Sequence, residues 1–291
     1  MASIYSNIST NKRNTVLFML FFTAFVSVVS LILARAFLGD SPFMLILALV
    51  FSVGSSLIGY FNSDKIALAV NGARPLSEQE NPYVHNLVEN LCIGAGLPKP
   101  KIYIIDSPAL NAFATGKDPK NSAICFTSGI IQNLEKLELE GVIAHELAHI
   151  GNYDIRLMTV VAVLAGSITI LINWISHSFL FGGSKRESSG LFVILGVFTL
   201  FLAPLVATII QLAISRNREY LADATGALLT RYPEGLANAL IKIAQSPDQL
   251  QGASPSTAHM FITNPFKGNT FMKLFATHPP VEDRVKRLQD M

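Results

Sequence analysis

The chain has 291 residues, of which 51% are apolar and 14% are charged, and its net charge is +2. Soluble domains contain about 25% charged residues, so this composition is typical of a membrane protein. The small net charge, without a basic cluster that alternates with aromatic residues, argues against a nucleic-acid-binding protein.

Four uncharged apolar stretches predict transmembrane helices, because each has about the 18 to 25 residues that a helix needs to cross a bilayer. They cover Val16–Ala34, Phe43–Tyr60, Leu157–Phe181 and Leu191–Ile214. The last two contain polar residues, so helices buried within the protein remain an alternative for them. More Lys and Arg residues flank one side of the stretches than the other, which predicts that both termini lie in the cytoplasm.

The same stretches predict the domain organisation. Residues 1–60 would form an N-terminal transmembrane hairpin, and residues 157–214 a second hairpin. Residues 61–156 and 215–291 are richer in charge and are interrupted by Pro and Gly, so they would form the two parts of one soluble domain. The predicted fold class is a mainly helical membrane protein with four transmembrane helices and this domain.

Local patterns predict the elements of the soluble domain. Apolar residues recur at helical spacing over 82–95, and a second helical pattern begins near Leu134. Residues 101–105 and 122–126 have the composition and the boundaries of short strands, and 111–116 is predicted to be extended as well. The domain is therefore expected to hold a small sheet among helices.

The second helical pattern contains His145, Glu146 and His149 in the order His-Glu-Leu-Ala-His. Two histidines at i and i+4 lie on one helix face, where both rings reach the same ion about 2 Å from each nitrogen. A glutamate beside the first histidine can accept a proton from a water bound to that ion. The motif predicts a zinc hydrolase, and the alternative is a chance match on an ordinary surface helix.

Hydrolytic zinc sites need a third protein ligand. Asp154 is close in sequence but follows a predicted helix break, so Glu219 is the better candidate. Asp223, four residues later, would face the same way and could hold the outer ring nitrogen of a ligand histidine. Taken alone, the charges of this segment favour an ordinary solvated charged face after a membrane helix. Two predicted membrane crossings between His149 and Glu219 would return the chain to the same side.

The sequence resembles the HtpX-type heat-shock membrane metalloproteases, which are relatives of the CAAX prenyl proteases. The resemblance covers most of the chain and depends on a set of motifs in a fixed order. These are 111–116 (NAFATG), 140–149 (EGVIAHELAH), 216–223, 258–262 (AHMFI), Asn264-Pro265, and 277–280 (THPP) with Arg284.

The resemblance implies a zincin-like α+β domain with one zinc ion held by His145, His149 and Glu219, and Glu146 as the general base. It implies that His278 lies near the metal, where it could donate to the oxyanion, and the alternative is a turn residue that caps the last helix. It also implies that an extended peptide substrate pairs with a strand, for which the alternative is an ordinary edge strand without a partner. The residues of that strand would be Asn111, Ala112, Phe113 and Ala114. His85, His177 and His259 are expected to be structural, and the roles of His259 and Arg284 stay open.

The expected function is that of a zinc metalloendopeptidase in the quality control of membrane proteins under stress. Its expected location is the bacterial inner membrane, as a multi-pass protein with the catalytic domain in the cytoplasm. Protein substrates, chiefly membrane proteins, and the lipid bilayer are the expected partners, whereas the oligomeric state is left open. Alternatives are a prenyl-peptide endoprotease, a non-catalytic adaptor stabilised by metal, and an iron site with the same three ligands.

Overall fold

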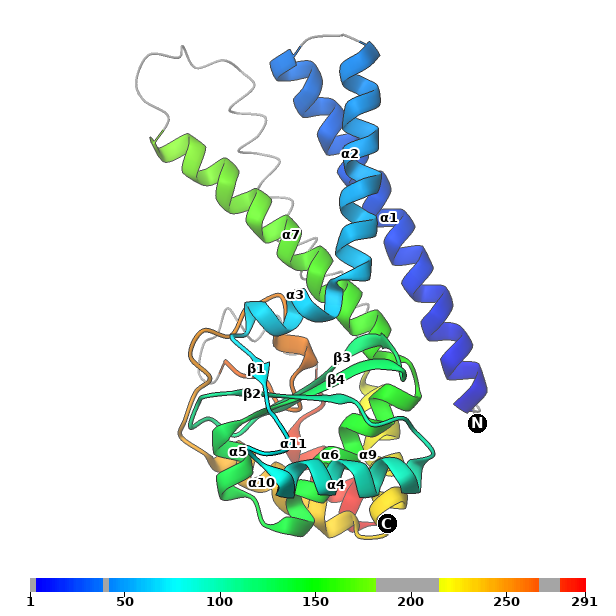
Figure 1. Ribbon diagram of the computed structural model, residues 1–291, viewed down its shortest axis with the longest axis vertical. Coiled ribbons are helices and arrows are strands. Elements are labelled where there is room, and N and C mark those ends of the chain that lie inside the picture. The colour runs from blue at the N-terminus through cyan, green and yellow to red at the C-terminus, as the bar shows by residue number, and fades with distance from the viewer. Residues whose placement is uncertain (1–3, 39–41, 182–214, 267–277) are drawn as a thin grey trace.

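The computed structural model describes residues 4–38, 42–181, 215–266 and 278–291. Three long helices project from a part that contains a small sheet and the shorter helices (Figure 1). The long helices are α1 (Ile4–Leu38), α2 (Pro42–Phe61) and α7 (Asp154–Phe181). α1 packs against both α2 and α7, so the N-terminal helix is joined to the rest of the molecule.

The prediction of four transmembrane helices is wrong. Within the described residues, none of the helices combines the length and apolarity that a membrane crossing needs. The reason is clearest in α7, which contains the third apolar stretch. In the first turns of this helix, Leu157, Val161 and Ala165 are fully buried by the protein itself. The fourth stretch, Leu191–Ile214, lies outside the described residues, and so does the rest of the predicted second hairpin from residue 182 onward.

A four-stranded sheet forms the centre of the other part, in the order β1-β2-β4-β3. Its strands are β1 (Arg74–Pro75), β2 (Lys101–Ile105), β3 (Ala112–Asp118) and β4 (Asn121–Thr127). β2 and β4 are parallel, with Ile102 opposite Ile124, whereas the other two pairs are antiparallel. β3 is therefore an edge strand of this sheet.

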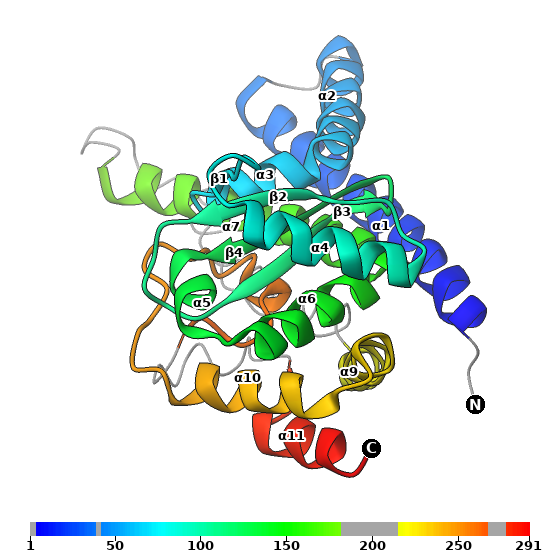
Figure 2. The same ribbon diagram turned by 60° about the horizontal axis from the view of Figure 1, so that its bottom comes forward.

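Helices cover both faces of the sheet (Figures 1 and 2). They are α3 (Ser63–Val70), α4 (Pro82–Ala95), α5 (Ser128–Asn133), α6 (Lys136–Gly151), α9 (Arg216–Thr230), α10 (Pro233–Gln245), the 3-10 turn η1 (Ala258–Met260) and α11 (Val281–Gln289). Side chains alternate along β4: Ile124 and Phe126 join the core under α4 and α6, and Ala123 and Cys125 join the core under α3 and α7. This two-sided burial explains the continuous apolar run of that strand.

Local signals set the element boundaries. Asn81 caps α4 by accepting a hydrogen bond from Val84 N, and Gly96 ends that helix in the left-handed region, with φ at 64°. Glu135 and Glu138 form a capping box at the start of α6. The predicted ranges of α4 and β2 are confirmed, and those of β3, β4 and α6 are confirmed to within a few residues.

α6 is the central helix, and two glycines bring its neighbours close. A Cβ on Gly226 of α9 would lie 3.0 Å from His145 N, and a Cβ on Gly141 would lie 2.6 Å from Leu236 N in α10. Backbones can approach this closely only where no side chain intervenes. α9 and α10 are thus held directly against the helix that carries the His-Glu-Leu-Ala-His motif.

Candidate metal centre

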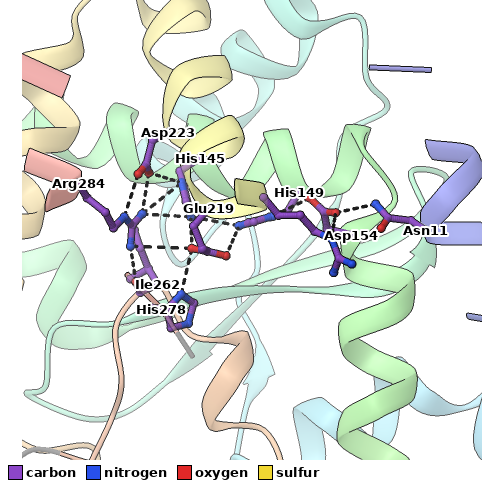
Figure 3. A network of polar contacts seen from close by, with 10 residues as sticks. Asn11, His145, His149, Asp154, Glu219, Asp223, Ile262, His278 and Arg284 are labelled. Atoms are coloured by element: carbon purple, nitrogen blue, oxygen red, sulfur yellow. Dashed lines mark hydrogen bonds and ion pairs between the residues drawn. The ribbon is translucent and has the colours of Figure 1, made fainter. Parts of the chain in front are cut away.

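Two helices, α6 and α9, bring the candidate ligand residues together (Figure 3). α6 supplies His145, Glu146 and His149, and α9 supplies Glu219 and Asp223. The packing of α9 on α6 brings Glu219 to the two histidines across 70 residues of sequence. The sequence predicts that an even number of membrane crossings brings Glu219 close to the histidines. In the structure, the direct packing of α9 on α6 accounts for their proximity.

His145, His149 and Glu219 are buried and form a group that can hold a metal ion, because one ligand atom from each lies within 4.8 Å of the others. The two Nε2 atoms are 3.2 Å apart, and Glu219 carboxylate oxygens lie 3.8 Å from His145 Nε2 and 3.6 Å from His149 Nε2. Ligand atoms about 2.1 Å from a tetrahedral zinc ion are about 3.4 Å apart. The separations therefore fit such an ion.

A carboxylate holds the outer nitrogen of each candidate ligand histidine. His145 Nδ1 lies 2.9 Å from Asp223 Oδ1, and His149 Nδ1 lies 3.0 Å from Asp154 Oδ2. Each contact favours the tautomer with the ring proton on Nδ1, which in a neutral ring leaves the Nε2 lone pair free for a metal ion. Two such lone pairs and the Glu219 carboxylate then converge on one buried point, and only a positive charge satisfies all three.

Electrostatic shifts follow from this convergence. Burial would raise the pKa of Glu219, but His278 and His149 hold it well below its usual value. Burial lowers the pKa of His145 to about 4. Burial would also lower the pKa of His149, but Glu219 and the hydrogen bond to Asp154 outweigh it and raise the value to about 9. The cluster thus keeps an ionised carboxylate and attracts positive charge.

Arg284 in α11 is fully buried and holds Asp223 with two hydrogen bonds. Its Nε lies 2.9 Å from Asp223 Oδ2 and its Nη2 lies 2.7 Å from Asp223 Oδ1. Nη1 also donates to Ile262 O at 2.9 Å. The arginine therefore fixes the carboxylate that contacts His145, and it links the C-terminal helix to the site.

Glu146 is also buried, and burial raises the pKa of its carboxyl group to about 7. The positive charge of His149 lowers this pKa, and the backbone of Ala114 in β3, which hydrogen-bonds the carboxyl group, lowers it too. A carboxyl group with a pKa close to neutral can both accept and release a proton. Its position beside His145 suits the predicted general base.

His278 lies against the cluster, with its Nδ1 2.9 Å from Glu219 Oε2. The pair nevertheless lacks hydrogen-bond geometry, and both ring nitrogens of His278 and Glu219 Oε2 are buried without a hydrogen-bond partner among the described residues. Polar atoms buried in this way mark a place where a further group fits. The position agrees with the predicted location of His278, and its oxyanion role stays a prediction.

The predicted substrate strand is only partly available. Asn111 precedes β3, and its side-chain amide donates to Thr263 O. Ile262 N donates to Ala112 O at 2.9 Å, and Phe113 forms an antiparallel β-bridge with Phe261. A peptide could pair at Ala112 and Phe113 only by displacing residues 261–263. Ala114, whose backbone bonds Glu146, lies closest to the predicted base. Substrate binding by this strand stays a prediction.

Sequence reasoning missed the contacts of Asp154, Arg284 and Asn11. Asp154 was considered as a metal ligand, whereas it supports His149 through the outer nitrogen. Its position five residues after His149 was the only local signal. Arg284 and Asn11 reach the site from opposite ends of the chain, and no local pattern pairs them with their partners.

The chain matches the model of a protein family, Peptidase family M48, over residues 78–291. A protein named Protease HtpX homolog from Tropheryma whipplei (strain Twist) is 45% identical, over 99% of this chain and 98% of that protein. Proteins of the same name from Dictyoglomus thermophilum and Ligilactobacillus salivarius are 45% and 41% identical, over 99% of this chain and 95% and 100% of their own lengths.

Among solved structures, the crystal structure of S. mikatae Ste24p is similar to this chain. The TM-score is 0.47 and the sequence identity 23%, over 92% of this chain. This chain spans 66% of the length of that protein, slightly less than two thirds.

Proposed function

The chain belongs to the HtpX-type proteases of peptidase family M48, and from this premise we propose a zinc-dependent endopeptidase that works at a membrane surface. The protein is a metalloprotease, a hydrolase that acts on peptide bonds. The identity of the metal, the location and the substrates are the parts that we propose. The predicted substrates are membrane proteins, handled in quality control under stress.

One observation carries the proposal for the metal. Both ligand histidines direct Nε2 atoms at the same buried point as Glu219, and these atoms are free to bind a metal in the neutral rings because Asp223 and Asp154 occupy the Nδ1 atoms. Two imidazoles, one carboxylate and an adjacent glutamate form the donor set of a hydrolytic zinc site. The same three ligands also occur at non-haem iron, but Glu146 beside them favours hydrolysis over oxygen chemistry.

A zinc ion held by His145, His149 and Glu219 would polarise the scissile carbonyl and lower the pKa of a bound water. Glu146 takes a proton from the attacking water and delivers it to the leaving amine. Asp223 and Asp154 keep each imidazole in the tautomer that leaves Nε2 free. His278, which faces Glu219, is placed to donate to the developing oxyanion.

Exposed apolar side chains support the proposed membrane location. Ile46, Val50, Val53 and Leu57 of α2 are exposed and recur at i, i+4, i+7 and i+11, so they form a stripe along one face. Exposed Val16, Leu17, Leu20 and Phe21 of α1 add further apolar surface. Apolar patches of this kind mark contact with a membrane or another protein. The multi-pass arrangement with cytoplasmic termini was derived from four spans, which the described helices do not provide.

The test compares the wild type with Glu146→Gln in zinc content and casein cleavage. The variant should bind one zinc per chain and lose about 100- to 10,000-fold in cleavage rate, since it retains the ligands and loses the base. Glu140→Gln, in the same helix but remote from the cluster, should cleave like the wild type. A Glu146→Gln protein that cleaves at the wild-type rate would contradict the assignment of Glu146 as the general base.

Zinc ligation is tested separately by Glu219→Ala. Removal of one of three protein ligands should lower the zinc stoichiometry, measured by elemental analysis after dialysis. Unchanged stoichiometry would identify another third ligand. A non-catalytic adaptor would show the opposite pattern, in which ligand variants unfold but Glu146→Gln changes nothing.

A further inference from the structure

The N-terminal helix reaches the site through one buried side chain, Asn11. Asn11 is 2% exposed, and its Nδ2 donates to Asp154 Oδ1 at 2.7 Å and to Asn152 O at 3.0 Å. Because both partners are acceptors, they determine which end of the amide faces them. Asn11 lies in α1, outside the residues 78–291 that match the peptidase family.

Asp154 passes this contact on to the metal cluster (Figure 3). Its second oxygen, Oδ2, lies 3.0 Å from His149 Nδ1, and the side chain is 2% exposed. Arg218 forms an ion pair with the same oxygen that Asn11 contacts, with its Nε 3.8 Å from Oδ1. Asn11 hydrogen-bonds this oxygen of the carboxylate that holds His149.

We propose that Asn11 is a positioning residue of the metal centre. It holds Asp154 in the orientation in which Oδ2 accepts the Nδ1 proton of His149, so that His149 Nε2 points at the metal. The docking of α1 on the catalytic part is then coupled to metal affinity. This inference rests on the proposed zinc site and deepens it.

The turn between α6 and α7 shows why an outside contact is needed. Asn152 and Tyr153 form this turn, and Tyr153 adopts the left-handed region with φ at 59°, which costs about 1–2 kcal/mol for a residue with a side chain. Lys12 of α1 lies over the Tyr153 ring at 4.2 Å, and Tyr60 of α2 accepts a hydrogen bond from Arg156. Both N-terminal helices thus hold the turn that presents Asp154.

The alternative is that Asn11 only docks α1, with no effect on the metal. The two cases differ in zinc affinity, which a chelator competition measures without any proteolysis. They also differ in additivity. If Asn11 acts through Asp154, its removal adds nothing once Asp154 has been changed, whereas independent docking effects would add.

The experiment measures zinc affinity of the full chain for Asn11→Leu, Asp154→Asn and the double variant. Leucine retains the branched shape of asparagine and removes the donor. Asp154→Asn should weaken zinc binding about 10- to 100-fold, because Asp154 contacts the ligand His149 directly. Asn11→Leu should weaken it about 5-fold, because Asn11 contacts the ligand only through Asp154. The double variant should match Asp154→Asn to within about 2-fold.

Thr15→Val is the matched control. Thr15 is fully buried one turn along α1, and among the described residues its hydroxyl donates only to Asn11 O within the same helix. It should retain wild-type zinc affinity. If Asn11→Leu does not fold by circular dichroism, Asn11→Gln, which keeps the amide, replaces it in the comparison with Thr15→Val. The glutamine variant should bind zinc more weakly than the wild type because its longer side chain displaces the donor.

Two results would overturn the inference and are distinguishable. Wild-type zinc affinity in the folded Asn11 variants, or a double variant in which the two losses multiply, would reject the positioning role and leave the zinc site intact. A wild-type chain that binds no zinc would reject the zinc site and the inference together.

Discussion

At the residue scale, one buried arginine joins the parts of the site that lie furthest apart in sequence. Arg284 contacts Asp223 with a bidentate pair and Ile262 O with its remaining nitrogen, and its side chain is inaccessible to solvent. A buried pair of this kind contributes little relative to an apolar pair of the same shape, but loss of one partner leaves an uncompensated charge.

Arg284→Met is therefore expected to lower the free energy of unfolding by about 3–5 kcal/mol, because Asp223 is left buried without its partner. It should also weaken zinc binding, since Asp223 orients His145. Denaturant unfolding and chelator competition measure the two effects. Lys286→Met, an exposed change in the same helix, should stay within about 0.5 kcal/mol of the wild type. Equal stability of the two variants would contradict the role given to Arg284.

His259 is a second buried group, and it predicts a pH dependence. It is 1% exposed, its Nε2 lies 3.0 Å from Met158 O, and burial lowers its pKa to about 4. The folded state keeps the ring neutral, whereas the unfolded state takes up a proton below about pH 6.5. The contribution to stability is therefore complete above pH 6.5 and is lost as the pH falls from there toward 4.

His259→Gln, which retains a donor to Met158 O, should remove this part of the pH dependence. Between pH 6.5 and 4 the wild type should lose about 3 kcal/mol more stability than the variant. Denaturant unfolding of the chelator-treated protein at both pH values measures the difference, so metal release does not contribute. Equal losses of stability in the wild type and the variant between pH 6.5 and 4 would show that His259 does not titrate as its burial implies.

At the scale of elements, the site depends on how closely helices pack on α6. The metal cluster needs α9 at a distance that lets Glu219 reach the histidines, and close approach at Gly226 provides it. α10 packs on the opposite part of α6 at Gly141. Small residues in these two contacts therefore position the candidate ligands.

Gly141→Ala should destabilise the protein by about 1–3 kcal/mol, because the added methyl group meets Leu236 N at 2.6 Å and the backbones must separate. This outweighs the roughly 1 kcal/mol that alanine gains over glycine in a helix. The comparison is Gly151→Ala in the same helix, where the nearest side-chain atom is at 3.6 Å, an ordinary contact. In thermal unfolding, the Tm of Gly141→Ala should be below that of the wild type, and the Tm of Gly151→Ala should equal or exceed that of the wild type. The reverse order would refute the close-packing argument.

At the scale of the whole molecule, the part around the sheet and the N-terminal helices differ in how they expose apolar residues. The part around the sheet buries its apolar residues on both faces, whereas α2 leaves an apolar stripe exposed. α1 belongs to both, because its N-terminal turns dock beside the metal centre through Asn11. The exposed apolar surface and the candidate metal centre are thereby connected through a single helix.

The stripe predicts binding to phospholipid vesicles. A variant with Ile46, Val50 and Leu57 all changed to Glu should bind vesicles at least about tenfold more weakly, because burial of one such side chain contributes about 1.5–3 kcal/mol. Vesicle flotation measures the bound fraction. Ile93→Glu, at an exposed position of α4, is the control and should float like the wild type. Unchanged flotation of the triple variant would mean that α2 does not contact the bilayer.

Much of the local structure follows from the sequence by itself. Helix α4, strand β2 and the start of α6 follow from side-chain periodicity and from capping residues such as Asn81 and Glu135, which act within a few positions. The face shared by His145, Glu146 and His149 follows from helix geometry alone. The family also follows from motifs along the chain.

Only the tertiary structure decided what surrounds these elements. Hydropathy cannot distinguish a helix buried in protein from one in lipid, so α7 was taken for a transmembrane helix although its first turns form the protein core. Contacts such as Arg284 with Asp223 and Asn11 with Asp154 join residues 61 and 143 positions apart. Such pairings leave no local pattern, because they depend on how whole helices pack, and packing determines which buried charges meet.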